Sequence, residues 1–283
     1  MRLLESKSAK CVAYCCAYPV PMTLSAQLWI IREVCMKSPF RLAALVAMCL
    51  LSTLAQAEFT LDKYRVVLAS GERSIDLRIF NTGEDYSSYR VQLLDMQMDE
   101  EGQLSPVEDY AYSAKQLVRI GPRMSKNLTP HTYQKVRIRA RGNNEDGEFR
   151  THLLIEELLP PYEGDLQGMV LRPNLKMIIP VIVQSGNVDV DVTADQFQFD
   201  AESHKLTFVI HRQGNASAFG NMVLVDPDGN EVFRKHNIGI YREIEQRHFT
   251  IDLPDGIASV KDYAFTFLQA ESEMVLIHHT IES

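Results

Sequence analysis

Short runs in which apolar and polar residues alternate one by one recur along most of the chain after residue 58. Such alternation gives a β-strand one apolar, half-buried face. Segments rich in Gly, Asn, Asp and Pro, which favour tight turns, separate the runs. The clearest runs are 75–79, 89–93, 136–138, 188–192, 206–210, 249–253 and 263–267. The pattern predicts an all-β chain built from antiparallel sandwiches.

The segment 36–57 has the three parts of a secretory signal peptide. A basic start precedes an uncharged apolar run, and the small residues Ala55 and Ala57 complete a cleavage site. A transmembrane anchor is the alternative, but the apolar run is shorter than the roughly 20 residues that a spanning helix needs. We therefore expect export, with cleavage after Ala57. Met36 is the more natural start, and residues 1–35 are left out of the fold prediction.

Removal of this leader changes the composition of the chain. All five cysteines lie in the first 49 residues, so the remaining 226 residues contain none. A disulfide scaffold, a cysteine zinc site and a thiol nucleophile are therefore excluded. The leader holds six of the 29 Lys and Arg residues and two of the 37 Asp and Glu residues, which leaves a net charge of −12. This acidic balance argues against a nucleic-acid partner.

The mature length suits two sandwiches of about 100 residues each better than one. A polar, glycine-containing step at 184–187 follows the apolar run 175–183. We predict a leader over 1–57, a first domain over 58–184 and a second over 185–283.

Motifs of catalysis are missing from the sequence. It has no nucleotide-binding glycine pattern, no hydrolase elbow and no histidine spacing suited to a metal. Two carboxylate pairs, Glu100–Glu101 and Glu156–Glu157, could suggest glycoside hydrolysis. The first pair lies in a polar turn and the second ends an apolar strand, which favours ordinary surface charges. We predict no catalytic residue, no metal and no cofactor.

Six segments carry a family pattern: 61–85, 113–140, 146–160 and 175–183 in the first domain, and 211–224 and 239–253 in the second. The four segments of the first domain, in this order, resemble the PapD-like periplasmic pilus chaperones. The second domain resembles a divergent branch of the same family more loosely.

The resemblance implies two immunoglobulin-like β-sandwiches and a chaperone that lends a strand to an incomplete fibre subunit. It also implies that one arginine and one lysine hold the subunit's C-terminal carboxylate. Arg65 matches that arginine and Lys176 matches that lysine. Met169 and Leu171 are the apolar candidates for the donated strand, although Pro173 interrupts the segment and cannot donate a ladder hydrogen bond.

We therefore expect a periplasmic, non-enzymatic chaperone of pilus or fimbrial subunits. Its partners would be exported subunits and an outer-membrane usher, and the free protein could self-associate through open sheet edges. One alternative is a secreted β-sandwich that binds a ligand or mediates adhesion. A lower-ranked alternative is a carbohydrate hydrolase on a β-scaffold, which needs two carboxylates roughly 5–10 Å apart in one pocket.

Overall fold

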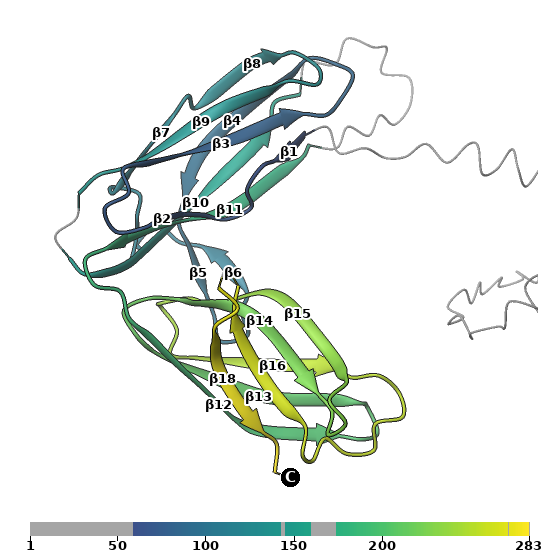
Figure 1. The fold of residues 1–283 in the computed structure, drawn as a ribbon. Coiled ribbons are helices and arrows are strands. Elements are labelled where there is room, and N and C mark those ends of the chain that lie inside the picture. The colour runs from purple at the N-terminus through teal and green to yellow at the C-terminus, as the bar shows by residue number, and fades with distance from the viewer. Residues whose placement is uncertain (1–58, 143–144, 160–173, 271, 283) are drawn as a thin grey trace, which may run out of the picture. The chain divides into compact units, whose positions relative to one another are not determined.

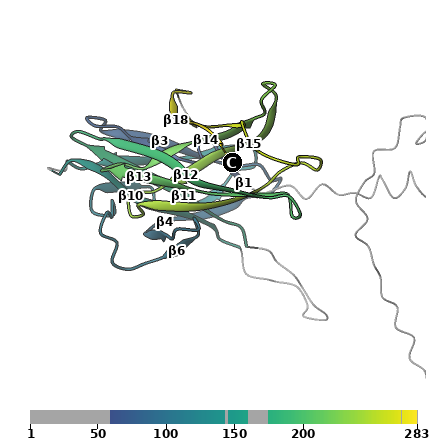
Figure 2. The same cartoon turned by 90° about the horizontal axis from the view of Figure 1, so that it is seen from below.

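The computed structural model describes residues 59–142, 145–159, 174–270 and 272–282. This part of the chain consists of strands, turns and loops and contains no helix (Figures 1 and 2). Accordingly, no described helix is long and apolar enough to cross a membrane. The predicted leader, and Met169 and Leu171 of the predicted donor strand, lie outside the described residues.

The first sandwich consists of two sheets. A four-stranded sheet has the order β1-β3-β9-β7, and a five-stranded sheet has the order β2-β11-β10-β4-β8. Their strands are β1 (Phe59–Leu61), β2 (Val66–Leu68), β3 (Ser74–Asn81), β4 (Ser87–Leu94), β7 (Val118–Gly121), β8 (Met124–Leu128), β9 (Tyr133–Ala140), β10 (Gly147–Glu157) and β11 (Lys176–Ser185). All pairings are antiparallel except that of β2 with β11.

Alternation in the sequence explains the core of this sandwich. In β3, Leu77 and Ile79 are buried while Arg78 between them is exposed. In β9, Val136 and Ile138 are buried in the same way. Successive side chains of a strand point to opposite faces, so each strand contributes one apolar face to the core and one polar face to the surface.

The second sandwich pairs a three-stranded sheet with a four-stranded sheet. Their orders are β12-β13-β16 and β15-β14-β17-β18. The strands are β12 (Val190–Asp200), β13 (Lys205–Gly214), β14 (Ala218–Val225), β15 (Glu231–Ile240), β16 (Gln246–Asp252), β17 (Ala264–Gln269) and β18 (Val275–Thr280). Phe208 and Phe265 pack at a centroid distance of 4.9 Å inside this core.

The turn between β14 and β15 shows why the predicted turn residues are needed. Gly229 has a φ of 87°, a conformation that costs glycine little because it has no Cβ. The side chain of Asp226 accepts hydrogen bonds from the backbone N–H groups of Asp228 and Asn230, at 3.0 and 2.8 Å. The local sequence therefore closes this hairpin by itself.

A two-stranded hairpin, β5 (Met96–Met98) with β6 (Leu104–Pro106), leaves the first sandwich and contacts the second. Met98 belongs to the buried core of the second sandwich. The N–H of His248 in β16 donates a 2.8 Å hydrogen bond to the carbonyl of Glu100 at the hairpin turn. The polar turn expected around Glu100 thus covers the outer edge of the β12-β13-β16 sheet.

The predicted fold class, all-β with two sandwiches, is confirmed. The last strand of the first sandwich, β11, ends at Ser185, and the first strand of the second, β12, begins at Val190. Within the described residues, no sheet mixes strands from the two sides of this step.

Candidate functional site

Arg65 lies directly before β2, where the first sandwich contacts the second. Its guanidinium carbon is 4.2 Å from the ring centroid of Phe219 in β14, a cation–π distance. The side chain is half-buried. β2 runs parallel to β11 with Val66 opposite Val181, so the local register places Arg65 beside the middle of β11.

A hollow of about 470 Å³ opens beside Arg65. The first sandwich contributes Glu148 of β10 and Gln184 of β11, which are direct neighbours across the strand pair. The second contributes Ser217 and Phe219. A cation, an amide, a hydroxyl and an aromatic ring therefore border one polar hollow.

Glu148 is the unusual member of this set, because only 2% of its surface is exposed. The Ser217 hydroxyl donates a short hydrogen bond to its carboxylate, and the Arg65 charge and the Gln184 side chain also favour the ionised form. Burial outweighs these effects and raises the pKa of the carboxyl above its ordinary value. Glu72 also lines the hollow, which therefore already contains two carboxyl groups, and Glu148 competes for the donors around it.

Lys176 lies at the other end of β11. Its Nζ is 3.0 Å from the Glu156 carboxylate, and this contact is the main cause of the lowered pKa of Glu156. Along β10, Glu156 pairs with Lys176 and Glu148 pairs with Gln184, eight positions away. Eight residues of a strand span about 27 Å.

The structure therefore does not bring Lys176 to Arg65, and the expected two-cation site is not formed by this pair. The physical reason is the strand register. The parallel pairing of β2 with β11 places Arg65 level with Pro180, and Lys176 is four residues, about 13 Å, farther along the strand. The β11 residue that borders the hollow is Gln184, and neither composition nor alternation singles it out.

The first half of β11 has an open edge. β10 pairs with β11 along its whole length, but β2 covers only Val181–Val183 on the other side. Within the described residues no strand pairs with that side of 176–180. Ile178 in this stretch is 44% exposed. An unpaired edge with an exposed apolar side chain invites another strand to pair.

A second arginine lies at the contact between the sandwiches, but its side chain is buried in an ion pair and does not border a hollow. Arg150 of β10 and Glu243, which follows β15, form a 2.6 Å ion pair with side chains only 3% and 5% exposed. Glu243 also accepts hydrogen bonds from the Met98 N–H at 2.9 Å and the Tyr110 hydroxyl at 2.8 Å. The Arg150 guanidinium lies 3.5 Å from the centroid of the Tyr241 ring.

The carboxylate pairs noted in the sequence do not converge on a pocket. Glu156 is held by Lys176, while its neighbour Glu157 is buried at 4% exposure. Glu100 accepts a 3.1 Å hydrogen bond from Gln246. Among the described residues, no group of three or more His, Cys, Asp or Glu side chains is arranged to hold a metal ion.

Comparison by sequence finds no matching family model and no matching curated protein. Comparison of structures finds many similar chains. A chain of the CsuC–CsuE chaperone–tip adhesion subunit pre-assembly complex from archaic chaperone–usher Csu pili of Acinetobacter baumannii is 12% identical, with a TM-score of 0.50. The match covers 80% of this chain and 100% of that one.

Two further structures are similar at lower scores. The YadV chaperone is 10% identical over 79% of this chain and 98% of its own, with a TM-score of 0.48. A chain of the Salmonella enterica SafA pilin–SafB chaperone complex is 12% identical over 80% and 97%, with a TM-score of 0.45. At such identities the likeness is one of fold: two immunoglobulin-like β-sandwiches, as in the PapD-like chaperones.

Proposed function

We propose that this chain, which has the fold of the PapD-like chaperones, is an exported periplasmic chaperone for pilus or fimbrial subunits. Its signal peptide would be cleaved after Ala57, and it would act without catalysis. The observation that carries the proposal is the open edge of β11 beside the hollow at Arg65. A strand-donating chaperone needs both an unpaired strand and a fixed point that sets the register of the partner strand.

The first half of β11 supplies the unpaired strand in this proposal. Ile178 is exposed there, while the flanking Met177 and Ile179 are less so. A subunit lacking one strand would pair its own edge with this one, and alternate apolar side chains would fill its groove. Met169 and Leu171, earlier in the chain, would extend the donated strand.

Arg65 supplies the fixed point. A C-terminal carboxylate leaving water needs charge-assisted donors, and a guanidinium offers two parallel N–H groups. The hydroxyl of Ser217 and the amide of Gln184 line the same hollow and could complete the site. For Lys176 to bind the subunit's C-terminal carboxylate, its ion pair with Glu156 would have to break and the subunit would have to reach that end of β11.

The open edge also bears on the proposed partners. An outer-membrane usher would receive the loaded complex. In the free protein, a second copy could cover the unpaired edge of β11 and so produce self-association, because unpaired strand edges template pairing with other chains.

Co-expression with candidate exported fibre subunits tests the proposal. We expect Arg65→Ala to lower subunit accumulation at least about tenfold, as for loss of a buried charge-assisted contact. Lys176→Ala should have a smaller effect, because that side chain is exposed and occupied by Glu156. Arg234→Ala is the matched control, since Arg234 is an exposed arginine paired with Glu231 in the second sandwich.

If the fibre subunit accumulates equally with wild type and with all three variants, the chaperone proposal is wrong. It would favour the alternative of a secreted sandwich that binds ligand or mediates adhesion without chaperoning. For the hydrolase alternative, neither carboxylate pair lines any of four hollows among the described residues.

A further inference from the structure

The outer face of the β3-β9-β7 layer concentrates positive charge on an otherwise acidic protein. In β9 the buried residues Val136 and Ile138 alternate with Lys135, Arg137 and Arg139, all of which are exposed. The mature chain carries a net charge of −12, so a run of cations on one face is not a consequence of overall composition.

One end of this face is neutralised by the protein itself. Asp76 of β3 is 2.9 Å from Arg137 and 3.4 Å from Lys135. These contacts, with Arg137 the larger, lower the pKa of the Asp76 carboxyl, which therefore stays ionised at neutral pH. Two of the cations thus have an internal anionic partner.

The other end is not neutralised. Four exposed arginines lie at or near this end of the layer, and we call them the arginine cluster: Arg73, Arg119, Arg139 and Arg141. Within the described part of the chain, none of the four forms an ion pair with a carboxylate. The cluster is therefore an excess of guanidinium groups facing solvent.

Strand pairing holds the cluster together. Arg119 of β7 is directly opposite Arg139 of β9, and Ser74 at the start of β3 is opposite Arg139 on the other side. Arg73 accepts a 3.0 Å backbone hydrogen bond from Ala140. The N–H of Arg141 donates a 2.6 Å bond to the carbonyl of Leu117. Like charges directly opposite across two strands destabilise a sheet, so the cluster does not serve the stability of the fold.

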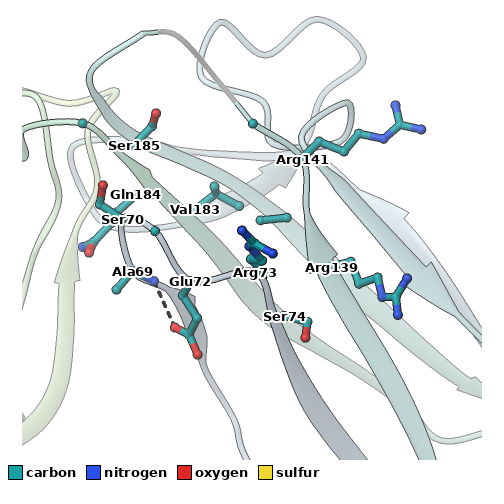
Figure 3. A pocket seen from close by; sticks show the side chains of 14 residues that line it. Ala69, Ser70, Glu72, Arg73, Ser74, Arg139, Arg141, Val183, Gln184 and Ser185 are labelled. Atoms are coloured by element: carbon teal, nitrogen blue, oxygen red, sulfur yellow. Dashed lines mark hydrogen bonds between the residues drawn. The ribbon is translucent and has the colours of Figure 1, made fainter.

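A hollow of about 740 Å³ adjoins the cluster. Figure 3 shows Arg73 near the middle of this hollow, with Arg139 and Arg141 at one side of it and their side chains directed outward. The only carboxylate in its lining, Glu72, accepts a 3.2 Å hydrogen bond from the N–H of Ala69 instead of pairing with an arginine. A positively charged surface therefore adjoins this hollow.

We propose that the arginine cluster docks an extended acidic segment of a partner protein. In an extended chain, side chains on one face recur about every 6.8 Å. Arg139 in β9 and Arg141, one residue past the end of β9, are two positions apart, and the N–H of Arg141 continues the pairing with the β7 side. Carboxylates at alternate positions would meet these guanidiniums in turn, with charge-assisted hydrogen bonds. Arg119 of β7 lies opposite Arg139 and flanks this row. Arg73 precedes β3 and lies opposite Ala140, so it belongs to the other face of the layer, at the hollow.

A polypeptide fits the surface better than an anionic membrane does. An anionic membrane is much larger than the arginine cluster, so it interacts with the charge of the whole molecule. The net charge of −12 repels such a membrane. A narrow acidic segment feels mainly the charges within a Debye length, about 8–10 Å at physiological salt. It can also enter the hollow, which a flat bilayer cannot. None of the four arginines lines the hollow at Arg65, although the two hollows share Ala69, Glu72 and Gln184, so variants of the arginines leave the proposed subunit site unchanged in sequence.

Binding of a short fluorescent peptide in which Glu and Thr alternate tests the inference, with the mature protein and anisotropy as the readout. The triple variant Arg119→Gln, Arg139→Gln, Arg141→Gln should bind about tenfold more weakly than wild type, since it removes three exposed charge contacts that are each weak. The triple Lys205→Gln, Lys235→Gln, Lys261→Gln removes the same charge from exposed positions of the second sandwich and should change affinity less than about twofold.

Two results would overturn the inference. Equal loss in both triple variants would mean that net charge alone governs peptide binding. Absence of peptide binding at low salt, together with arginine-dependent sedimentation on vesicles containing phosphatidylglycerol, would identify a membrane as the occupant. Folding is checked separately: because the first triple relieves the repulsion between Arg119 and Arg139, its melting temperature should not fall below that of wild type.

Discussion

Two glutamates are buried where the sandwiches contact each other, and each lies near an arginine. Glu243 accepts hydrogen bonds from Arg150, from the Met98 N–H and from the Tyr110 hydroxyl. Glu148 accepts one from Ser217 and borders the hollow at Arg65. The first carboxylate is met by three donors, whereas burial raises the pKa of the second. The first site is built to hold the sandwiches, and the second has room for another carboxylate.

This comparison predicts the largest effect at the closed site. Arg150→Met leaves Glu243 buried without its cation and should lower the free energy of unfolding by about 3–5 kcal/mol. Arg234→Met, which breaks an exposed pair, should cost less than about 1 kcal/mol. Urea denaturation of both variants measures the difference. Similar small losses in the two would show that the Arg150–Glu243 pair does not join the sandwiches.

Met98 of the β5–β6 hairpin provides the next test. Its N–H donates a hydrogen bond to Glu243, and its side chain packs in the core of the second sandwich. Met98 is 6% exposed within that core, so Met98→Ala should destabilise the protein by about 2–5 kcal/mol. Met124→Ala, at a 44% exposed position of β8, is the matched control and should cost less than about 0.5 kcal/mol. If thermal melts of the two variants coincide, the hairpin does not pack as described.

The smallest effect concerns Glu148 and depends on pH. Its folded-state pKa is raised, so wild type loses stability as the pH rises above the unfolded value of about 4.5, until the folded-state pKa is passed. Glu148→Gln removes this loss. The variant should therefore gain stability relative to wild type between pH 4 and neutral pH, and chemical denaturation at both values measures the gain.

The difference in the free energy of unfolding between Glu148→Gln and wild type could instead stay constant across that pH range. That result would contradict the contrast between Glu148 and Glu243, because it would mean that the protein accommodates the charge of Glu148. The same variant also bears on the proposed function. Since Glu148 competes for the donors at Arg65, its neutralisation should strengthen rather than weaken the binding of a subunit carboxylate.

Much of the fold could be predicted from local sequence, because strands and turns are encoded within a few residues. The alternation of Leu77 and Ile79 with charged neighbours predicts a half-buried strand, and Asp226 and Gly229 predict the turn that the structure contains. The β5–β6 hairpin was foreseen only as a polar turn around Glu100. Its packing against β16 depends on a partner nearly 150 positions later in the sequence.

The candidate site was predicted only in part. Arg65 was singled out by a resemblance, and it does border a polar hollow. Lys176 was paired with it by the same resemblance, but the register between β2 and β11 separates them. Glu148, Gln184 and Ser217 carry no local signal, since a glutamate, a glutamine and a serine are common surface residues.

By itself, the sequence determined the class of the protein: an all-β chain with a predicted export signal and a mature part free of cysteine. The alternation of side chains and the residue preferences of turns act over a few residues, so strands and turns can be predicted without knowledge of the whole fold. The tertiary structure alone decided which charges meet. Strand register and sheet order set those contacts. A shift of four residues along β11 is enough to keep Lys176 out of the site at Arg65.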